Sequence, residues 1–275
     1  MPDDLKKKIL GWLDDHGYPF EMTVARAFQD ADFTVRQSIN YVDPDTEKTR
    51  EMDVSASITS RVGEYRLTME FLISCKATSK PWIVFTSPTT NVFMGVFRRK
   101  ASDAGRLLLL NFLDGESPAL EFFQYPSRVG YSATEALRSS DNDAAYGALC
   151  GLAQALEGLL KNFKPLYDYK SDGHGDFTKL TRSLLILVGV VIVDHPVFEC
   201  YLDENDKLVL EEIDWTTILW QKEPIYIVSS RALKTFAAEA AKSANEFFAG
   251  AAPLTTGLDE ALKNYRENQR AREEE

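Results

Sequence analysis

The segment Leu184 to Val193 constrains the fold most, because it is continuously apolar and rich in β-branched side chains. A strand with one face in water alternates apolar and polar residues, whereas a strand covered on both faces reads as an unbroken apolar run. About ten residues are too few to cross a bilayer as a helix. The segment is therefore predicted to be a buried strand with other elements packed on both of its faces.

Size and composition are those of an ordinary globular protein. A chain of 275 residues forms one large domain or two, and chains of this size bury about 75% of their unfolded surface. The first residues, Met1 to Asp4, lack the basic start and the apolar stretch of a secretory signal. Three widely spaced cysteines provide neither a disulfide framework nor paired metal ligands. These features favour a cytoplasmic protein that does not associate with membranes.

Charge is unevenly distributed along the chain. Residues 1–100 hold 14 basic and 14 acidic residues, which leaves 17 basic and 28 acidic residues in 101–275, so the net charge of −11 lies entirely in the second part. A polyanion is repelled by the second part and tolerated by the first. Any nucleic acid is therefore expected to bind the N-terminal part. The simpler alternative is that the acidity serves only solubility.

Periodic patterns predict a mixed α/β architecture. Apolar residues at helical spacing predict helices over 5–13, 21–31, 142–163 and 231–248, with a charged helix over 257–275. Alternating or continuous apolar patterns predict strands over 33–42, 52–58, 65–77, 81–85, 184–193, 198–202, 207–210 and 225–228. The segment 107–112 fits either a helix or a strand. The chain has no internal repeat and no long linker, which favours one compact α/β body with an added C-terminal layer.

Two neighbouring strands are expected to bring chemically active side chains together. If the strands on either side of Gly63 and Glu64 form a hairpin, opposed residues have position numbers that sum to 127. Asp53 then lies opposite Ser74. Because side chains alternate along a strand, Ser74 and Lys76 share one face. Asp53, Ser74 and Lys76 are therefore predicted to converge on one small volume.

Such a cluster suits the hydrolysis of a phosphodiester. Hard cations such as Mg²⁺ prefer oxygen ligands, usually one or two carboxylates together with waters. A bound cation polarises the phosphate and lowers the pKa of a bound water. A nearby lysine orients that water or neutralises the charge that builds on the phosphate. Asp53 and Lys76 supply groups of these two kinds.

In these residues the chain resembles the restriction-endonuclease-like superfamily, which is named for its PD-(D/E)xK motif. The resemblance covers about residues 18–85 and rests mainly on Arg50-Glu51-Met52-Asp53-Val54 followed by Ser74-Cys75-Lys76. It implies a core of a helix, a three-stranded antiparallel meander, a second helix and a strand. It also implies that Asp53 holds Mg²⁺ or Mn²⁺ and that Lys76 positions water. Some branches, including the Holliday-junction resolvases, add a glutamate from the first helix, and Glu21 matches it as a further metal ligand.

The sequence departs from the family pattern at Ser74, where the family places Glu, Asp or sometimes Gln. A neutral hydroxyl is a weaker Mg²⁺ ligand than a carboxylate. Glu70 lies on the same strand face but about 13 Å away at ~3.3 Å per residue, too far to serve metals that sit about 4 Å apart. Glu51 is one step from Asp53, about 7 Å along the strand. The predicted residual site consists of Glu21, Asp53 and Lys76, with an oxygen from Ser74 or from the Cys75 carbonyl.

Each candidate also has a purely structural interpretation. Asp53 fits a cap at a strand start, and Lys76 fits an edge lysine that blocks aggregation. Glu21 fits an acid favoured by the dipole of its helix. Ser74 fits a small polar strand residue, and Cys75 is expected to be buried rather than nucleophilic.

Other groups of residues give weaker signals. Residues 172–176, Asp-Gly-His-Gly-Asp, fit a flexible loop better than a metal site. A compact basic run, 98–100, either touches phosphate or, as is commoner for such a run, lies on a solvated loop. Trp215, Trp220 and Tyr226 are expected to pack a C-terminal layer, with base stacking as the alternative.

Two functions remain open. The first is a Mg²⁺-dependent nuclease-like protein, and the retained Asp53 and Lys76 favour it slightly. The second is a catalytically inactive protein of the same fold that binds nucleic acid or a protein partner, which Ser74 and the net acidity favour. Residues 1–100 are expected to form one half of the core. Residues 101–275 are expected to form the rest of the core and an α+β extension whose acidic surface holds a second copy or a protein partner.

Overall fold

The computed structural model describes residues 2–62, 65–89, 99–111, 118–137, 143–163, 182–255, 257–258 and 260. Within these ranges the chain forms one mixed sheet of eleven strands and five α-helices, so the predicted α/β class is confirmed. The hairpin turn at Gly63 and Glu64, the loop at 172–176 and most of the charged segment 257–275 lie outside the described residues.

The helices are α1 (Pro2–Asp15), α2 (Tyr18–Asp30), α4 (Asp103–Asn111), α5 (Ala144–Lys161) and α6 (Leu233–Ala251). The strands are β1 (Thr34–Val42), β2 (Thr49–Val62), β3 (Tyr65–Lys76), β4 (Trp82–Pro88), β5 (Lys100–Ala101), β6 (Arg128–Glu135), β7 (Arg182–Val193), β8 (Val197–Leu202), β9 (Leu208–Ile213), β10 (Trp215–Trp220) and β11 (Glu223–Ser229). Their order in the sheet is β1-β2-β3-β7-β11-β10-β6-β4-β8-β9, and β5 pairs with β7 outside this order.

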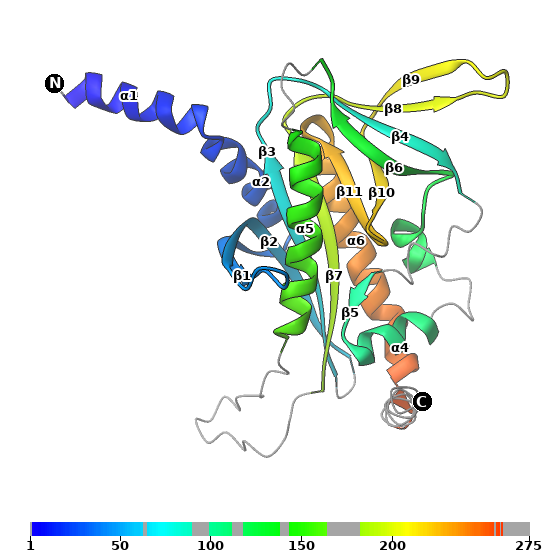
Figure 1. The fold of residues 1–275 in the computed structure, drawn as a ribbon. Helices are drawn as coiled ribbons and strands as arrows, with labels where there is room; N and C mark the ends of the chain where they lie inside the picture. Colours follow the sequence, from blue (N-terminus) through cyan, green and yellow to red (C-terminus); the bar gives the residue numbers. More distant parts are fainter. Residues whose placement is uncertain are drawn as a thin grey trace.

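The apolar run 184–193 forms most of β7, which is covered on both faces as predicted. All its even-numbered residues from Leu184 to Ile192 pack on the side of α2 and α6. Leu185, Leu187, Val191 and Val193 pack on the side of α5. Figure 1 shows α5 crossing one face of the sheet and α6 lying behind it. The sheet is therefore the middle of three layers, and β7 lies at its centre.

Two kinds of pairing meet at β3. β1, β2 and β3 form an antiparallel meander, and β3 then pairs in parallel with β7 along its whole length, from Tyr65 to Lys76. The β2–β3 pairs run from Val54–Ile73 to Val62–Tyr65. Their position numbers sum to 127, so the predicted hairpin register is confirmed.

Several elements were not predicted from the sequence. The strands β5, β6 and β10 were missed, and the ambiguous segment 107–112 belongs largely to helix α4. The basic run is not a solvated loop at its described positions, because Arg99 is buried and Lys100 pairs with Glu157 and Glu223. The Arg99 guanidinium lies 4.6 Å from the ring centre of Tyr226. That prediction was wrong because an apolar stem and an aromatic neighbour allow an arginine to be buried.

The predicted packing of the C-terminal aromatics agrees with their contacts. The rings of Trp215 and Tyr226 pack on Phe236 of α6, and Trp220 packs edge-on against Tyr146 of α5. Helix α6 buries its apolar side against the sheet, including Phe236, Ala240 and Phe247. Its use as a partner surface stays a prediction.

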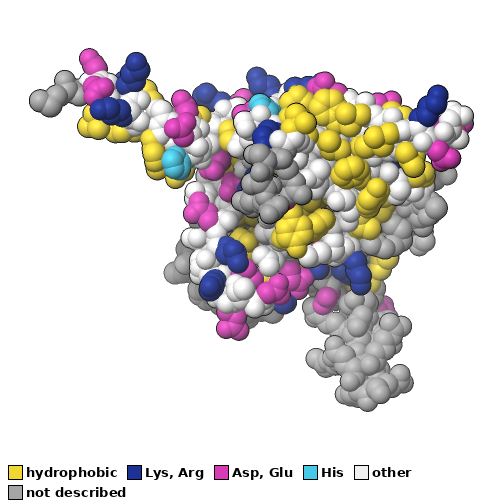
Figure 2. Space-filling model, turned by 45° about the horizontal axis from the view of Figure 1, so that its top comes forward, with side chains coloured by type: hydrophobic (Ala, Val, Ile, Leu, Met, Phe, Trp, Pro, Cys, Tyr) yellow, Lys and Arg dark blue, Asp and Glu magenta, His cyan; other side chains and the backbone are white. Residues whose placement is uncertain are grey.

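Helix α1 extends from the body of the protein, and Figure 2 shows hydrophobic side chains along one side of it. Leu5, Ile9, Leu10 and Trp12 are each about half exposed or more. No helix among the described residues is both long and apolar enough to cross a membrane.

Two glycines of α5 test how closely this helix approaches the sheet. A Cβ added at Gly158 would lie 2.4 Å from the carbonyl oxygen of Val42, whereas one added at Gly151 would meet nothing within 4 Å. Gly158→Ala is expected to lower the free energy of unfolding by about 1–3 kcal/mol. Gly151→Ala is expected to raise it by up to about 1 kcal/mol, because alanine favours a helix. Urea denaturation measures both changes, and stabilisation by both substitutions would contradict the close approach of α5 to β1.

Candidate functional site

The start of β2 and the end of β3 meet where the sequence predicted a site. The Asp53 carboxylate accepts a hydrogen bond from the Cys75 backbone N–H at 2.6 Å and one from the Ser74 hydroxyl at 3.4 Å. Both bonds use the same carboxylate oxygen, Oδ2. Asp53 is thereby fixed against the end of β3, and its second oxygen remains for another partner.

The regular alternation of β2 is interrupted at Asp53. Val54 and Ala56 pack on the side of α2 and α6, but Met52 packs on the side of α5. On the neighbouring strand Ser38, the residue in register with Asp53, has a φ of 53° and makes no pair. This local turn of both strands has no counterpart in the hydrophobic pattern of the sequence.

A cleft of about 370 Å³ opens between the strand ends and the first turns of α5. Its strand wall is polar except for Met52 and consists of Tyr41, Arg50, Glu51, Met52, Asp53, Ser74 and Lys76. Its helix wall consists of Gly147, Ala148, Gly151 and Leu152, none of which carries a polar side chain. The cleft lies at the carboxyl end of parallel strands β3 and β7, the edge at which open α/β sheets bind ligands.

Helix α2 brings Glu21 to the same edge of the sheet. The N-cap of α2, Gly17, is so close to the residue after β3 that an added Cβ would lie 3.1 Å from the Cβ of Ala77. Burial, then the negative charges of Asp53 and Glu51, raise the pKa of Glu21, and the positive charge of Lys76 opposes this shift. Glu21 is not one of the residues that line the cleft, so it adds charge to the site from the α2 side.

Cys75 is buried beneath the site, as predicted. Burial, followed by the charges of Asp53 and Glu21, raises the pKa of its thiol well above the usual range. A thiol in this state is a poor nucleophile. The contribution of Cys75 to the site is its backbone N–H, which holds Asp53.

Lys76 supplies a cation that other groups leave available. It forms no ion pair with any residue in the described ranges, and it lines the cleft. Arg50 also lines the cleft, but its guanidinium is paired with the buried carboxylate of Asp43. Lys76 is therefore the better placed of the two to meet an anionic ligand.

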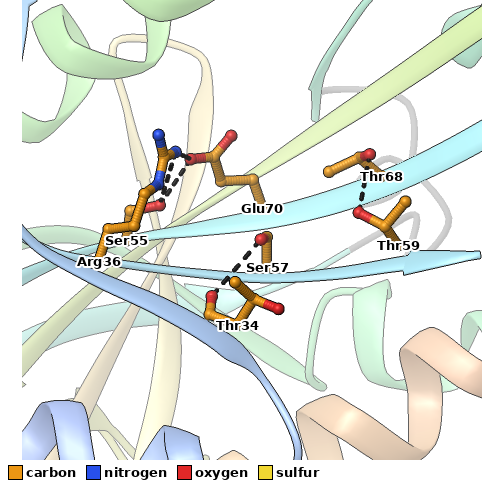
Figure 3. A network of polar contacts seen from close by, with 7 residues as sticks. All are labelled: Thr34, Arg36, Ser55, Ser57, Thr59, Thr68 and Glu70. Atoms are coloured by element: carbon orange, nitrogen blue, oxygen red, sulfur yellow. Dashed lines mark hydrogen bonds and ion pairs between the residues drawn. The ribbon is translucent and has the colours of Figure 1, made fainter. Parts of the chain in front are cut away.

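Glu70 does not belong to the site, in agreement with the distance argument. Its carboxylate pairs with Arg36 at 2.7 Å and accepts a hydrogen bond from Ser55 at 2.6 Å. Figure 3 shows this network on β1, β2 and β3, with the separate Thr59–Thr68 contact farther along the same strands. Glu70 therefore cannot replace the carboxylate that is missing at Ser74.

The acidic residues of the cleft suit a divalent cation only if water supplies most of its ligands. Nowhere in the described part of the chain do three His, Cys, Asp or Glu side chains form a group able to hold a metal. The cleft itself presents two carboxylates, Asp53 and Glu51. Mg²⁺ is commonly bound by one or two carboxylates and keeps several waters. Burial, and after it the negative charges of Asp53 and Glu51, raise the pKa of Glu21. A cation bound beside these carboxylates would relieve the part of the shift that comes from their charges.

Two parts of this site, Glu51 and the helix wall, were not predicted from the sequence to form it. Glu51 was placed one step from Asp53 and lines the cleft with it, whereas Glu21 was expected to be a ligand and lies outside the lining. The helix wall was not anticipated. A usable signal was the pair of glycines at 147 and 151, spaced four apart in a helix otherwise rich in alanine and leucine.

Comparison of the chain with protein-family models, with curated proteins and with solved structures finds no match. The function therefore has to be inferred from the chemistry of the site itself.

The raised pKa of Glu21 predicts how stability depends on pH. Because its carboxyl binds a proton more tightly in the folded state, folding loses stability as the pH rises from about 4.5 through the raised value. Glu21→Gln is expected to unfold at a higher temperature than the parent at about pH 7.5 and at the same temperature at about pH 3.5. Thermal denaturation checks this, with Glu239→Gln on the exposed face of α6 as the control. A gain from Glu21→Gln that persists unchanged in acid would show that the ionised Glu21 carboxylate is not the cause.

Proposed function

We propose that the protein is a divalent-metal-dependent phosphodiesterase of the restriction-endonuclease-like type, that it acts on nucleic acid, and that Ser74 limits its activity. The observation that carries the proposal is the convergence of Asp53 and Lys76, on adjacent strands, at the mouth of a cleft.

The order of elements supports the proposal. The core implied by the resemblance is a helix, a three-stranded antiparallel meander, a helix and a strand. The elements α2, β1–β2–β3, α5 and β7 follow this order, and α5 packs across β3 and β7. The segment from β4 to β6 is an insertion between β3 and α5, and β8 to α6 follow the core.

The residues of the cleft have distinct roles in the proposed reaction. Asp53, held by the Cys75 N–H, and Glu51 would hold the cation, and Lys76 would face the phosphate. When bound, Mg²⁺ or Mn²⁺ supplies a polarised phosphate and a water of lowered pKa. The water oxygen bonds to phosphorus and the P–O bond to the leaving oxygen breaks. One proton of the water goes to solvent and the leaving oxygen takes up a proton, so water and diester give a phosphomonoester and an alcohol.

Ser74 favours a second candidate function, a nuclease fold that binds nucleic acid or a partner without cutting. Its hydroxyl is buried and lies 3.4 Å from Asp53, where the family pattern has a second acid. A hydroxyl adds no negative charge and binds Mg²⁺ more weakly than a carboxylate. Metal-dependent cleavage of nucleic acid, even if weak, supports the first function, whereas binding without cleavage supports the second.

Asp53 and Lys76 provide the direct test. Asp53→Asn keeps the size of the side chain, and Lys76→Met keeps its length, but each removes one charge from the cleft. Each is expected to reduce Mn²⁺- or Mg²⁺-dependent cleavage of single-stranded DNA by about 100-fold. Circular dichroism and thermal denaturation establish that both variants fold. Cleavage by folded Asp53→Asn at the rate of the parent would eliminate this site.

Restoring the carboxylate at position 74 tests the role of Ser74. Ser74→Glu is expected to increase metal-dependent cleavage and the rise in melting temperature that Mn²⁺ produces, because a ligand that binds the folded state stabilises it. Ser74→Gln has almost the same size without the charge and is expected to show neither gain. If the parent cannot cut and Ser74→Glu can, the site is a decayed nuclease. Equal behaviour of Ser74→Glu and Ser74→Gln would remove position 74 from the metal site.

A further inference from the structure

We infer that the cleft binds one nucleotide unit of a single strand. The phosphate lies on the strand wall and the base lies on the face of α5 that carries Gly147 and Gly151. The substrate is therefore a strand end or a flexible single strand rather than intact duplex. This inference rests on the proposed function and specifies its substrate.

The size of the cleft sets the first limit. Its volume of about 370 Å³ lies at the lower end of the range of about 300–1,000 Å³ found for small-molecule sites. One nucleotide fits such a space, whereas a base-paired duplex is several times wider. Because the polar groups line this cleft, a phosphate must enter it to reach Asp53 and Lys76.

The two walls differ in chemistry in the way that a nucleotide does. Charged and hydroxyl groups come from β1, β2 and β3, and the α5 wall offers only glycine, alanine and leucine. A ligand that satisfies both walls has a charged part and a flat, largely apolar part. Because the first turns of α5 carry the positive end of its dipole, they also favour an anion in the cleft.

The glycines of α5 leave space that packing does not need. A Cβ at Gly147 or Gly151 would meet no atom within 4 Å, whereas Gly158 is required by the approach of Val42. Each glycine inside a helix costs about 1 kcal/mol relative to alanine. Gly147 and Gly151 thus keep a bare helix face open toward the cleft, on which a base can lie.

Binding of deoxyadenosine monophosphate and of inorganic phosphate, measured by calorimetry with Mg²⁺ present, tests the inference without requiring turnover. The parent is expected to bind the nucleotide more tightly than phosphate. Gly151→Leu is expected to weaken nucleotide binding by about tenfold or more while phosphate binding changes less than about twofold. Ala238→Leu places the same side chain on the exposed face of α6 and is the control for the substitution itself.

The outcomes separate this inference from the proposed function. Nucleotide binding that Gly151→Leu abolishes, in a protein that cuts nothing, supports the nucleotide cleft and refutes the phosphodiesterase. Nicking of covalently closed duplex circles as fast as cutting of linear single strands would overturn the cleft inference and leave the phosphodiesterase standing. Equal binding of phosphate and nucleotide, or no binding of either, would also overturn it.

Discussion

The parallel pairing of β3 with β7 is the constraint on which the rest of this structure depends. Two parallel strands cannot be joined by a tight turn, so the chain must cross over between them, and both strands then need cover on both faces. Helix α5 provides the cover on one face, and α2 with α6 provides it on the other. The same arrangement puts the first turns of α5 at the carboxyl ends of β3 and β7. The cleft at this edge is therefore a consequence of the pairing.

The site combines a rigid anchor with uncompensated charge. The Cys75 N–H fixes Asp53 at a point where β2 turns, and Glu51 and Glu21 add negative charge around it. Lys76 is the cation that opposes this charge. A protein selected for stability alone gains nothing from such repulsion, but a site for a cation and a phosphate requires charges of both signs at short range. Ser74 lowers the negative charge and with it the expected affinity for metal.

The sequence predicted the parts of the fold that depend on strong local patterns. The unbroken apolar run of β7, the alternation in β2 and the broad apolar face of α5 each identified an element, and one sum of position numbers fixed the β2–β3 register. From this register the meeting of Asp53 with Ser74 followed. Strands β6 and β10 were missed because their residues are mixed in polarity and their burial is decided by distant neighbours. The turn of β2 at Asp53 and the open helix wall depend on contacts between residues far apart in the chain. No local sequence pattern signals them.

The central claim is that the cleft between β2, β3 and α5 holds a divalent cation on Asp53. A crystal soaked in MnCl₂ and measured for the anomalous scattering of manganese tests it most directly. We expect one anomalous peak in the cleft, at a manganese ion bound to the second carboxylate oxygen of Asp53, and we expect this peak to be absent from crystals of Asp53→Asn. A manganese peak elsewhere on the protein, with ordered water alone beside Asp53, would contradict it.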